Sequence, residues 1–177
     1  IILKQFVTQA LQTRQECKEL IETNITASVR SLCNLFDAIA NPAYGLDPND
    51  PDYFDFMKKF LIFAMIWSIG ATVDEESRNK MDMLFREFDP QFPNKDTVYE
   101  YYVDPKTRSW RPWDEKVNPN WKPLDDVPYY NILVPTIDTV RNSFVLNALI
   151  SAKKNTLVIG NIGTGKTVTI KHVLGQL

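Results

Sequence analysis

The fold is decided by the stretch Gly160-Asn161-Ile162-Gly163-Thr164-Gly165-Lys166-Thr167 of this 177-residue sequence. It matches the pattern G-x-x-x-x-G-K-[ST] at every required position, and it holds three of the chain's six glycines. The apolar run 156–159 precedes it, and a helical pattern follows from about Lys166. A glycine loop between a strand and a helix is the setting of a phosphate-binding P-loop, so we expect a nucleotide site here.

Each residue type in this loop has a physical reason. Gly160, Gly163 and Gly165 permit positive φ and close backbone approach, so successive N–H groups can point at phosphates. The helix that follows presents the positive end of its dipole to the same anion. Lys166 can reach the β- and γ-phosphates, and the Thr167 hydroxyl can ligate Mg²⁺. The loop by itself therefore predicts ATP or GTP with Mg²⁺ as the ligand.

The predicted phosphate-binding residues, of which Thr167 is also the predicted metal ligand, are Gly160, Asn161, Ile162, Gly163, Thr164, Gly165, Lys166, Thr167 and Val168. Hydrolysis also needs an acidic group for magnesium and the attacking water, normally on a later strand. Ten residues follow Thr167 and none reads as a strand, whereas a βαβ unit takes about 30 residues or more. We expect the catalytic residues, Walker B and the sensors among them, beyond residue 177 or on another polypeptide.

Composition excludes some partners. Hydrophobic residues make up 44% and charged residues 24% of the chain, as in an ordinary soluble protein. The net charge of −2 gives no electrostatic reason to expect nucleic acid or an acidic membrane surface as a partner. The longest apolar run, 60–69, is about half the ~20 residues that a membrane span needs, so it predicts a buried core helix.

The two cysteines and the first residues give weaker signals. Cys17 and Cys33 match no zinc spacing and are too few for a disulfide framework, which favours reduced, partly buried thiols in a cytosolic protein. The start, residues 1–4, lacks an initiator methionine and the plan of a signal peptide. We expect a piece of a longer chain.

The first half of the chain is helical in pattern. Apolar residues recur at helical spacing over 1–41, and the weak helix formers 23–26 can separate two helices there. A further helix is predicted over 53–69, with Gly70 as its stop. Thr72 and Glu75 have the spacing of a capping box and predict another helix, which Asp89-Pro90 closes.

A β-hairpin and a linker follow. The stretch 97–103 is rich in β-branched and aromatic residues, 104–107 is a turn signal, and 109–111 can return as the partner strand. Residues 112–128 contain four prolines and predict a linker. Beyond it we expect a short strand over 131–134, a helix capped by Thr136 or Asp138 and running to about Lys153, and a buried strand over 156–159.

Other chemistry-bearing residues have simpler interpretations. The only histidine, His172, lies two turns from the loop, which favours a surface or packing role. The run Asp74-Glu75-Glu76 favours carboxylates at a helix N-terminus over a metal cluster. Arg141 can be a nucleotide contact or a surface charge, and both stay open. Packing is also the expected role of the tryptophans Trp67, Trp110, Trp113 and Trp121.

Three further stretches resemble the dynein heavy chains, motors with a ring of six AAA+ modules. Phe60-Leu61-Ile62-Phe63-Ala64-Met65-Ile66-Trp67-Ser68-Ile69-Gly70-Ala71 is similar to the helix at the boundary of the second and third modules. Val98-Tyr99-Glu100-Tyr101-Tyr102-Val103 with Trp110-Arg111-Pro112-Trp113 resembles the hairpin that follows it. Leu133-Val134-Pro135-Thr136-Ile137-Asp138-Thr139-Val140-Arg141 resembles the segment before the third module's P-loop. Residues 1–50 match only loosely.

The resemblance implies roles. Val134, Pro135 and Thr136 would lie near the adenine, and the glycine loop would hold the phosphates of ATP or ADP with Mg²⁺. The third module is mainly regulatory in the family, and its nucleotide state controls the main motor site in the first module. The expected partners are neighbouring AAA+ modules, microtubules through the full motor, and dynein intermediate and light chains. Residues 67–71 and the hairpin resemble axonemal dyneins more than cytoplasmic ones. The resemblance implies a location in the cytoplasm and cytoskeleton, in the axoneme of a cilium or flagellum.

The expected fold is therefore a fragment of an α/β P-loop NTPase of the AAA+ class. Residues 1–50 would form the helical C-terminal part of one module, 51–128 helices plus a β-hairpin linking segment, and 129–177 the first strand–P-loop–helix of the next large subdomain. Two alternatives to a motor ATPase stay open. One is another AAA+ remodelling ATPase, and the other is a structural module that keeps its nucleotide permanently.

Overall fold

The computed structural model describes residues 2–123, 128 and 132–176 of the chain. It divides into two compact units, residues 1–111 and residues 112–177. None of the helices in these described ranges is both long and apolar enough to cross a bilayer. We describe each unit by itself.

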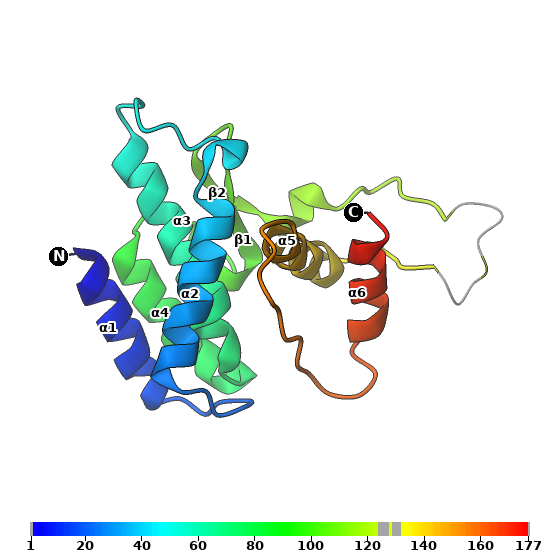
Figure 1. Cartoon of the computed structure of the whole chain (residues 1–177), viewed down its shortest axis with the longest axis horizontal. Coiled ribbons are helices and arrows are strands. Elements are labelled where there is room, and N and C mark those ends of the chain that lie inside the picture. Colours follow the sequence, from blue (N-terminus) through cyan, green and yellow to red (C-terminus); the bar gives the residue numbers. More distant parts are fainter. Residues whose placement is uncertain (1, 124–127, 129–131, 177) are drawn as a thin grey trace. The chain divides into compact units, whose positions relative to one another are not determined.

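The first unit is a bundle of four helices, shown in Figure 1: α1 (Ile2–Gln15), α2 (Ile25–Ile39), α3 (Tyr53–Ser68) and α4 (Glu75–Phe88). Helix α3 packs against α2 and α4, and α1 packs against α4. All side chains from Lys59 to Ile66 are buried, which confirms the predicted core helix. The predicted break near 23–26 is also confirmed, because α2 begins at Ile25 with Asn24 as its N-cap.

The cap of α4 differs from the prediction. Asp74, rather than Thr72, is the N-cap, and its Oδ1 accepts a hydrogen bond from the Ser77 amide at 3.0 Å. Thr72 lies in the preceding 3₁₀ turn η2 (Gly70–Thr72), where its hydroxyl donates to the Ile69 carbonyl at 2.8 Å. That local bond removes Thr72 from competition for the helix N-terminus. Glu75 and Glu76 lie in the first turn, which confirms the interpretation of these carboxylates as helix N-terminal charges.

Helix α3 ends directly before Gly70 as predicted, but packing requires this glycine rather than the left-handed conformation of a glycine cap. The helix ends at Ser68 with Ile69 as its C-cap in right-handed conformation, and Gly70 itself lacks positive φ. A Cβ on Gly70 would lie 2.9 Å from Cε2 of Phe85 and 2.9 Å from the hydroxyl of Tyr99. That hydroxyl donates to the Gly70 carbonyl at 2.9 Å, and burial raises the pKa of Tyr99, so the donor stays protonated.

The predicted hairpin is present as β1 (Tyr101–Asp104) and β2 (Ser109–Pro112). Residues 98–100, which we expected to be strand, form the 3₁₀ turn η3 (Val98–Glu100). Trp110 on β2 stacks on Phe92 with ring centroids 4.0 Å apart, and its Nε1 donates to the buried Asp89 carboxylate at 2.8 Å. The hairpin therefore shares the hydrophobic core of the helices.

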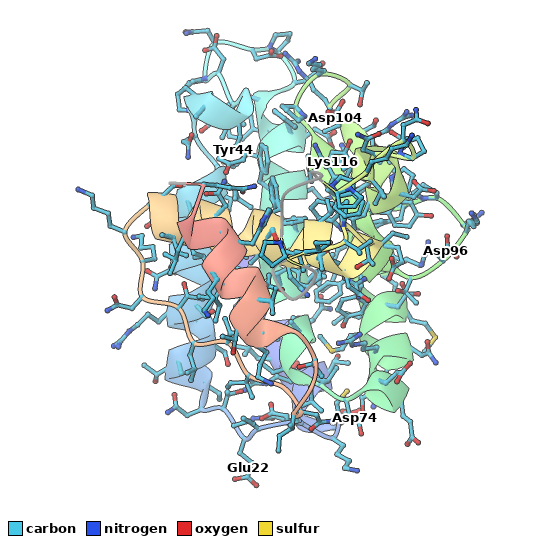
Figure 2. The ribbon with its side chains drawn as sticks, turned by 90° about the vertical axis from the view of Figure 1, so that its right-hand side faces the viewer. Glu22, Tyr44, Asp74, Asp96, Asp104 and Lys116 are labelled. Carbon is cyan, nitrogen blue, oxygen red and sulfur yellow. The ribbon has the colours of Figure 1, made fainter. Side chains whose placement is uncertain are left out.

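Side-chain and backbone bonds close the first unit at both ends. At one end, the Asp74 amide donates to the Lys18 carbonyl at 2.9 Å. At the other, the Arg108 guanidinium in the hairpin turn binds both carboxylate oxygens of Asp50, which lowers the pKa of that carboxyl. Figure 2 shows Glu22 and Asp74 at the first end, and Tyr44 and Asp104 at the second.

The second unit contains the 3₁₀ turn η4 (Trp113–Lys116), α5 (Ile137–Ser151) and α6 (Lys166–Leu174), and α5 packs against both of the others. Thr136 caps α5 as predicted, but the helix ends at Ser151 and Lys153 has a φ of 56°. Figure 1 shows the long connection from α5 to α6 that contains the glycine loop.

The two strands predicted in this unit are absent from the described residues. Asn131 lies outside them, and 132–134 and 156–159 form no strand. The segment 156–159 was also predicted to be buried, and this is wrong, because Leu157 is 82% exposed. A strand needs a hydrogen-bonded neighbour, and the β1–β2 hairpin is the only sheet in the part of the chain that is described.

Both cysteines carry free thiols. Cys17 is partly buried as predicted, and burial raises the pKa of its thiol. The prediction for Cys33 is wrong, since that side chain is exposed on α2.

The close contact at Gly70 predicts a destabilising variant. Gly70→Ala should lower the free energy of unfolding by about 1–3 kcal/mol, because the methyl group overlaps the buried Phe85 ring and Tyr99 hydroxyl. Urea denaturation of the 177-residue chain, followed by tryptophan fluorescence, measures the change. The penalty should be smaller when Tyr99→Phe is already present, since one of the two overlapping groups is gone. Equal stability of Gly70→Ala and the parent chain would contradict this packing.

Candidate nucleotide-binding loop

The glycines of the loop 160–167 have two separate roles. Gly163 has a φ of 84° and Gly165 a φ of 72°, and no heavy atom lies within 4 Å of a Cβ built on either. Their glycine character is therefore required by backbone conformation rather than by space. Gly160 lacks positive φ, but its Cβ would lie 3.3 Å from Oγ1 of Thr164 and 3.6 Å from Cδ of Lys166. At that position the absence of a Cβ allows the Thr164 and Lys166 side chains to approach the backbone closely.

Lys166 lies over the loop at the first residue of α6. Its Nζ donates to the carbonyls of Gly160 at 2.9 Å and Asn161 at 2.6 Å, and is 3.3 Å from Oγ1 of Thr164. The Thr164 hydroxyl donates in turn to the Asn161 carbonyl at 2.9 Å. These bonds close the loop around one ammonium group. An ammonium has three donors, so binding a phosphate oxygen would exchange at least one of these three contacts for a charge-assisted one.

The start of α6 suits an anion. Gly165 is the N-cap and supplies no side-chain acceptor, so no cap side chain covers the first amides of the helix. Helix N-termini of this kind favour phosphate groups. The Thr169 hydroxyl on the second turn bonds back to the Gly165 carbonyl at 3.1 Å, which fixes the join between loop and helix.

Thr167 and its neighbours are open to ligands. The loop residues 160–165 and Thr167 are exposed, and Lys166 is half-buried. The described residues contain no group of three or more His, Cys, Asp or Glu side chains that would hold a metal ion by themselves. A magnesium ion at Thr167 would therefore take its other ligands from outside these residues, such as phosphate oxygens, water or the acidic group expected elsewhere.

The predicted adenine segment lies at the N-terminus of α5. The Thr136 side chain accepts from the Thr139 amide at 3.2 Å, and the Thr139 hydroxyl accepts from the Thr136 amide at 2.7 Å. The Val134 carbonyl accepts from the Thr136 amide at 2.9 Å and from the Thr139 hydroxyl at 3.2 Å. Val134, Pro135 and Thr136 are thus tied to the helix, and their side chains are exposed or half-exposed.

The structure connects this segment to the glycine loop through helices. Helix α5 begins at the segment, α6 begins at the loop, and the two helices pack together. Within the described residues, no hydrogen bond or ion pair joins Val134, Pro135 or Thr136 directly to residues 160–168. The role of Thr139 was missed from the sequence, although the Thr136-x-x-Thr139 spacing is a signal for such a cap.

The other candidates have structural partners. His172 is exposed and hydrogen-bonded to Gln176 at 2.9 Å, so it takes a surface role as predicted. Arg141 pairs with Asp138 on the same face of α5, but its side chain is only 15% exposed, so this pair leaves both alternatives for Arg141 open. Packing is confirmed for Trp110 and Trp113, which are 4% and 0% exposed.

Two family profiles together match nearly the whole chain. Residues 2–115 match the one described as "Dynein heavy chain AAA lid domain". Residues 121–177 match the one described as "P-loop containing dynein motor region". The first match alone covers more than half of the chain, and the second contains the glycine loop.

Curated relatives agree with these profiles. Over 165 residues, 93% of this chain, the sequence is 42% identical to human "Dynein axonemal heavy chain 2", and over 178 residues, 99% of this chain, it is 39% identical to the mouse protein of that name. It is 34% identical over 99% of its length to "Dynein-1-beta heavy chain, flagellar inner arm I1 complex" of Chlamydomonas reinhardtii. The chain spans only 4–5% of the length of these relatives.

The contacts of Lys166 predict how loss of its ammonium group changes nucleotide affinity. Lys166→Ala should weaken nucleotide binding to the 177-residue chain about 10- to 100-fold, because a charge-assisted hydrogen bond contributes roughly 1.5–3 kcal/mol. Titration of a fluorescent ADP analogue measures the dissociation constant. Lys171→Ala is the matched control, since Lys171 is exposed in the last turn of the same helix. If the two variants bind equally well, Lys166 has no part in the site.

Proposed function

The chain belongs to the dynein heavy-chain family, and from this premise we propose that residues 160–168 bind the phosphates of ATP or ADP in a dynein motor region. The observation that carries the proposal is the position of Lys166. Its ammonium lies against the carbonyls of a glycine loop, directly before a helix whose N-cap has no side-chain acceptor. A lysine and a row of amides converging on one place form a phosphate site.

Further roles follow from the same geometry. Thr167 would ligate Mg²⁺ through its exposed hydroxyl, beside the phosphates that supply other ligands. Val134, Pro135 and Thr136 would contact the base, because they form a fixed segment at the end of the helix that packs on α6. Residues 1–50, 51–128 and 129–177 would be the end of one AAA+ module, the linking segment and the start of the next.

We assign the site to the third AAA+ module and give it a regulatory role in the whole motor. Support comes from the resemblance of 60–71 and 133–141 to the segments at that module boundary, together with the lid and P-loop profiles in the expected order. The whole protein would be an ATP-driven microtubule motor, working with neighbouring modules and with intermediate and light chains. The relatives are named axonemal or flagellar, which supports the axoneme as the location.

One alternative role at this site stays open. From residue 155 to residue 177 the sequence contains no aspartate or glutamate, so the carboxylate that orients an attacking water would come from another segment. A site without that carboxylate would retain its nucleotide as a structural element. A remodelling ATPase outside the dyneins loses its support, because the chain is a dynein heavy-chain sequence.

The regulatory role predicts a distinctive motor phenotype. A heavy chain with Lys166→Ala should still hydrolyse ATP at its main site, yet release microtubules poorly and move several-fold more slowly, since coupling between sites amounts to about 1–3 kcal/mol. Microtubule-stimulated ATPase and gliding speed are measured on one preparation, with Lys171→Ala as the control.

Two outcomes would contradict the assignment. Complete loss of basal ATPase in a folded Lys166→Ala motor would identify this as the main motor site and would place the segment in another module. Normal ATPase together with normal speed would leave the site a purely structural role.

A further inference from the structure

Among the residues that the structure describes, Trp113 is the largest fully buried side chain, and it does not belong to the glycine loop. It opens the 3₁₀ turn η4, directly after the hairpin strand β2. Its ring meets that of Phe144 on α5 edge to face, with centroids 5.3 Å apart and planes at 60°. Edge-to-face aromatic pairs at this distance are attractive beyond the area that they bury.

The contact joins segments that are distant in sequence. Thirty residues of chain lie between Trp113 and Phe144, and those described between η4 and α5 form neither helix nor strand. The described part of this connection therefore supplies no helix or strand that would fix where α5 lies. Helix α5 packs against η4 and α6. The Trp113–Phe144 pair is the aromatic part of the η4 contact.

Helix α5 carries the segment proposed to contact the base. The reciprocal Thr136–Thr139 bonds and the Val134 carbonyl tie residues 134–136 to the first turn of the helix, so the segment moves with it. The loop proposed to hold the phosphates is held by other bonds. The glycine loop is fixed to α6 through the Gly165–Thr169 bonds and to Lys166 through its carbonyls.

We propose that Trp113 is a positioning residue for nucleotide binding, which holds α5 so that residues 134–136 meet the base while the loop 160–168 meets the phosphates. Trp113 touches no nucleotide in this account. It acts through Phe144 and the helix. The inference rests on the proposed nucleotide site, and it adds that affinity for the base and affinity for the phosphates are set by different parts of the unit.

The test separates these two affinities. ADP needs both the base segment and the loop, whereas pyrophosphate needs only the loop. In the 177-residue chain, Trp113→Ala should weaken ADP binding about tenfold, because a loosened helix must be ordered when the ligand binds, and should leave pyrophosphate binding unchanged. Trp113→Phe, which keeps an aromatic ring against Phe144, should restore most of the ADP affinity. Isothermal titration with each ligand gives both dissociation constants.

Two further variants guard against a trivial loss of folding. Phe144→Leu removes the aromatic partner while keeping an apolar side chain, and it should change the ratio of ADP to pyrophosphate affinity in the same direction as Trp113→Ala. Trp121→Ala removes another tryptophan of the same unit, half-buried in the segment after η4, and should leave the ratio unchanged. A parallel loss of both ligands in Trp113→Ala and Phe144→Leu would show a merely structural role and overturn the proposal.

The remaining outcomes distinguish this proposal from the site on which it rests. An unchanged ADP-to-pyrophosphate ratio in Trp113→Ala and Phe144→Leu would overturn the positioning role, provided that Lys166→Ala weakens both ligands. If Lys166→Ala changes neither affinity, the nucleotide site itself is wrong, and the role of Trp113 falls with it.

Discussion

The burial of α3 is the constraint on which the first unit depends. Eight consecutive side chains from Lys59 to Ile66 are removed from water, and burying each of the large apolar ones contributes about 1.5–3 kcal/mol. A helix that is apolar on every side must be covered on every side. Helices α2 and α4 and the hairpin supply that cover, and α1 packs on α4. Even the hydroxyl of Tyr99 and the carboxylate of Asp89 are used inside this core, each with a hydrogen-bonded partner.

The second unit is built differently, and its chemistry follows from that. Its described core is small, with Trp113, Leu146, Ala148, Thr169 and Val173 as its buried side chains. The glycine loop lies outside this core, exposed and shaped by positive φ at Gly163 and Gly165. Such a loop keeps its amides and the Lys166 ammonium accessible to phosphates. A compact core beneath two helices and an exposed glycine loop between them together provide a place where an anion can be held.

Local sequence predicted the features that local physics determines. Apolar spacing identified the helices of the first unit, turn chemistry identified the hairpin at 104–107, and Thr136 was identified as a helix cap. The failures involve partners distant in sequence. Gly70 is required by Phe85 and Tyr99, and 156–159 forms no strand because strand structure needs a neighbour that the described residues do not supply. The cap at Asp74 was missed because two acceptors of similar chemistry lie two residues apart, and the 3₁₀ turn that selects between them was not foreseen.

The glycine loop could be predicted from its own residues, since each required position has a local reason. The Trp113–Phe144 contact could not be predicted, because the local sequence around either ring gives no indication of its partner. The central claim, that this loop holds a nucleotide, is tested most directly by an experimental structure of the intact motor with ADP and Mg²⁺ supplied. We expect the diphosphate against the amides of 160–168, with the Lys166 ammonium moved from the Gly160 and Asn161 carbonyls onto a phosphate oxygen. A well-resolved loop without nucleotide, and with Lys166 still on those carbonyls, would contradict the account.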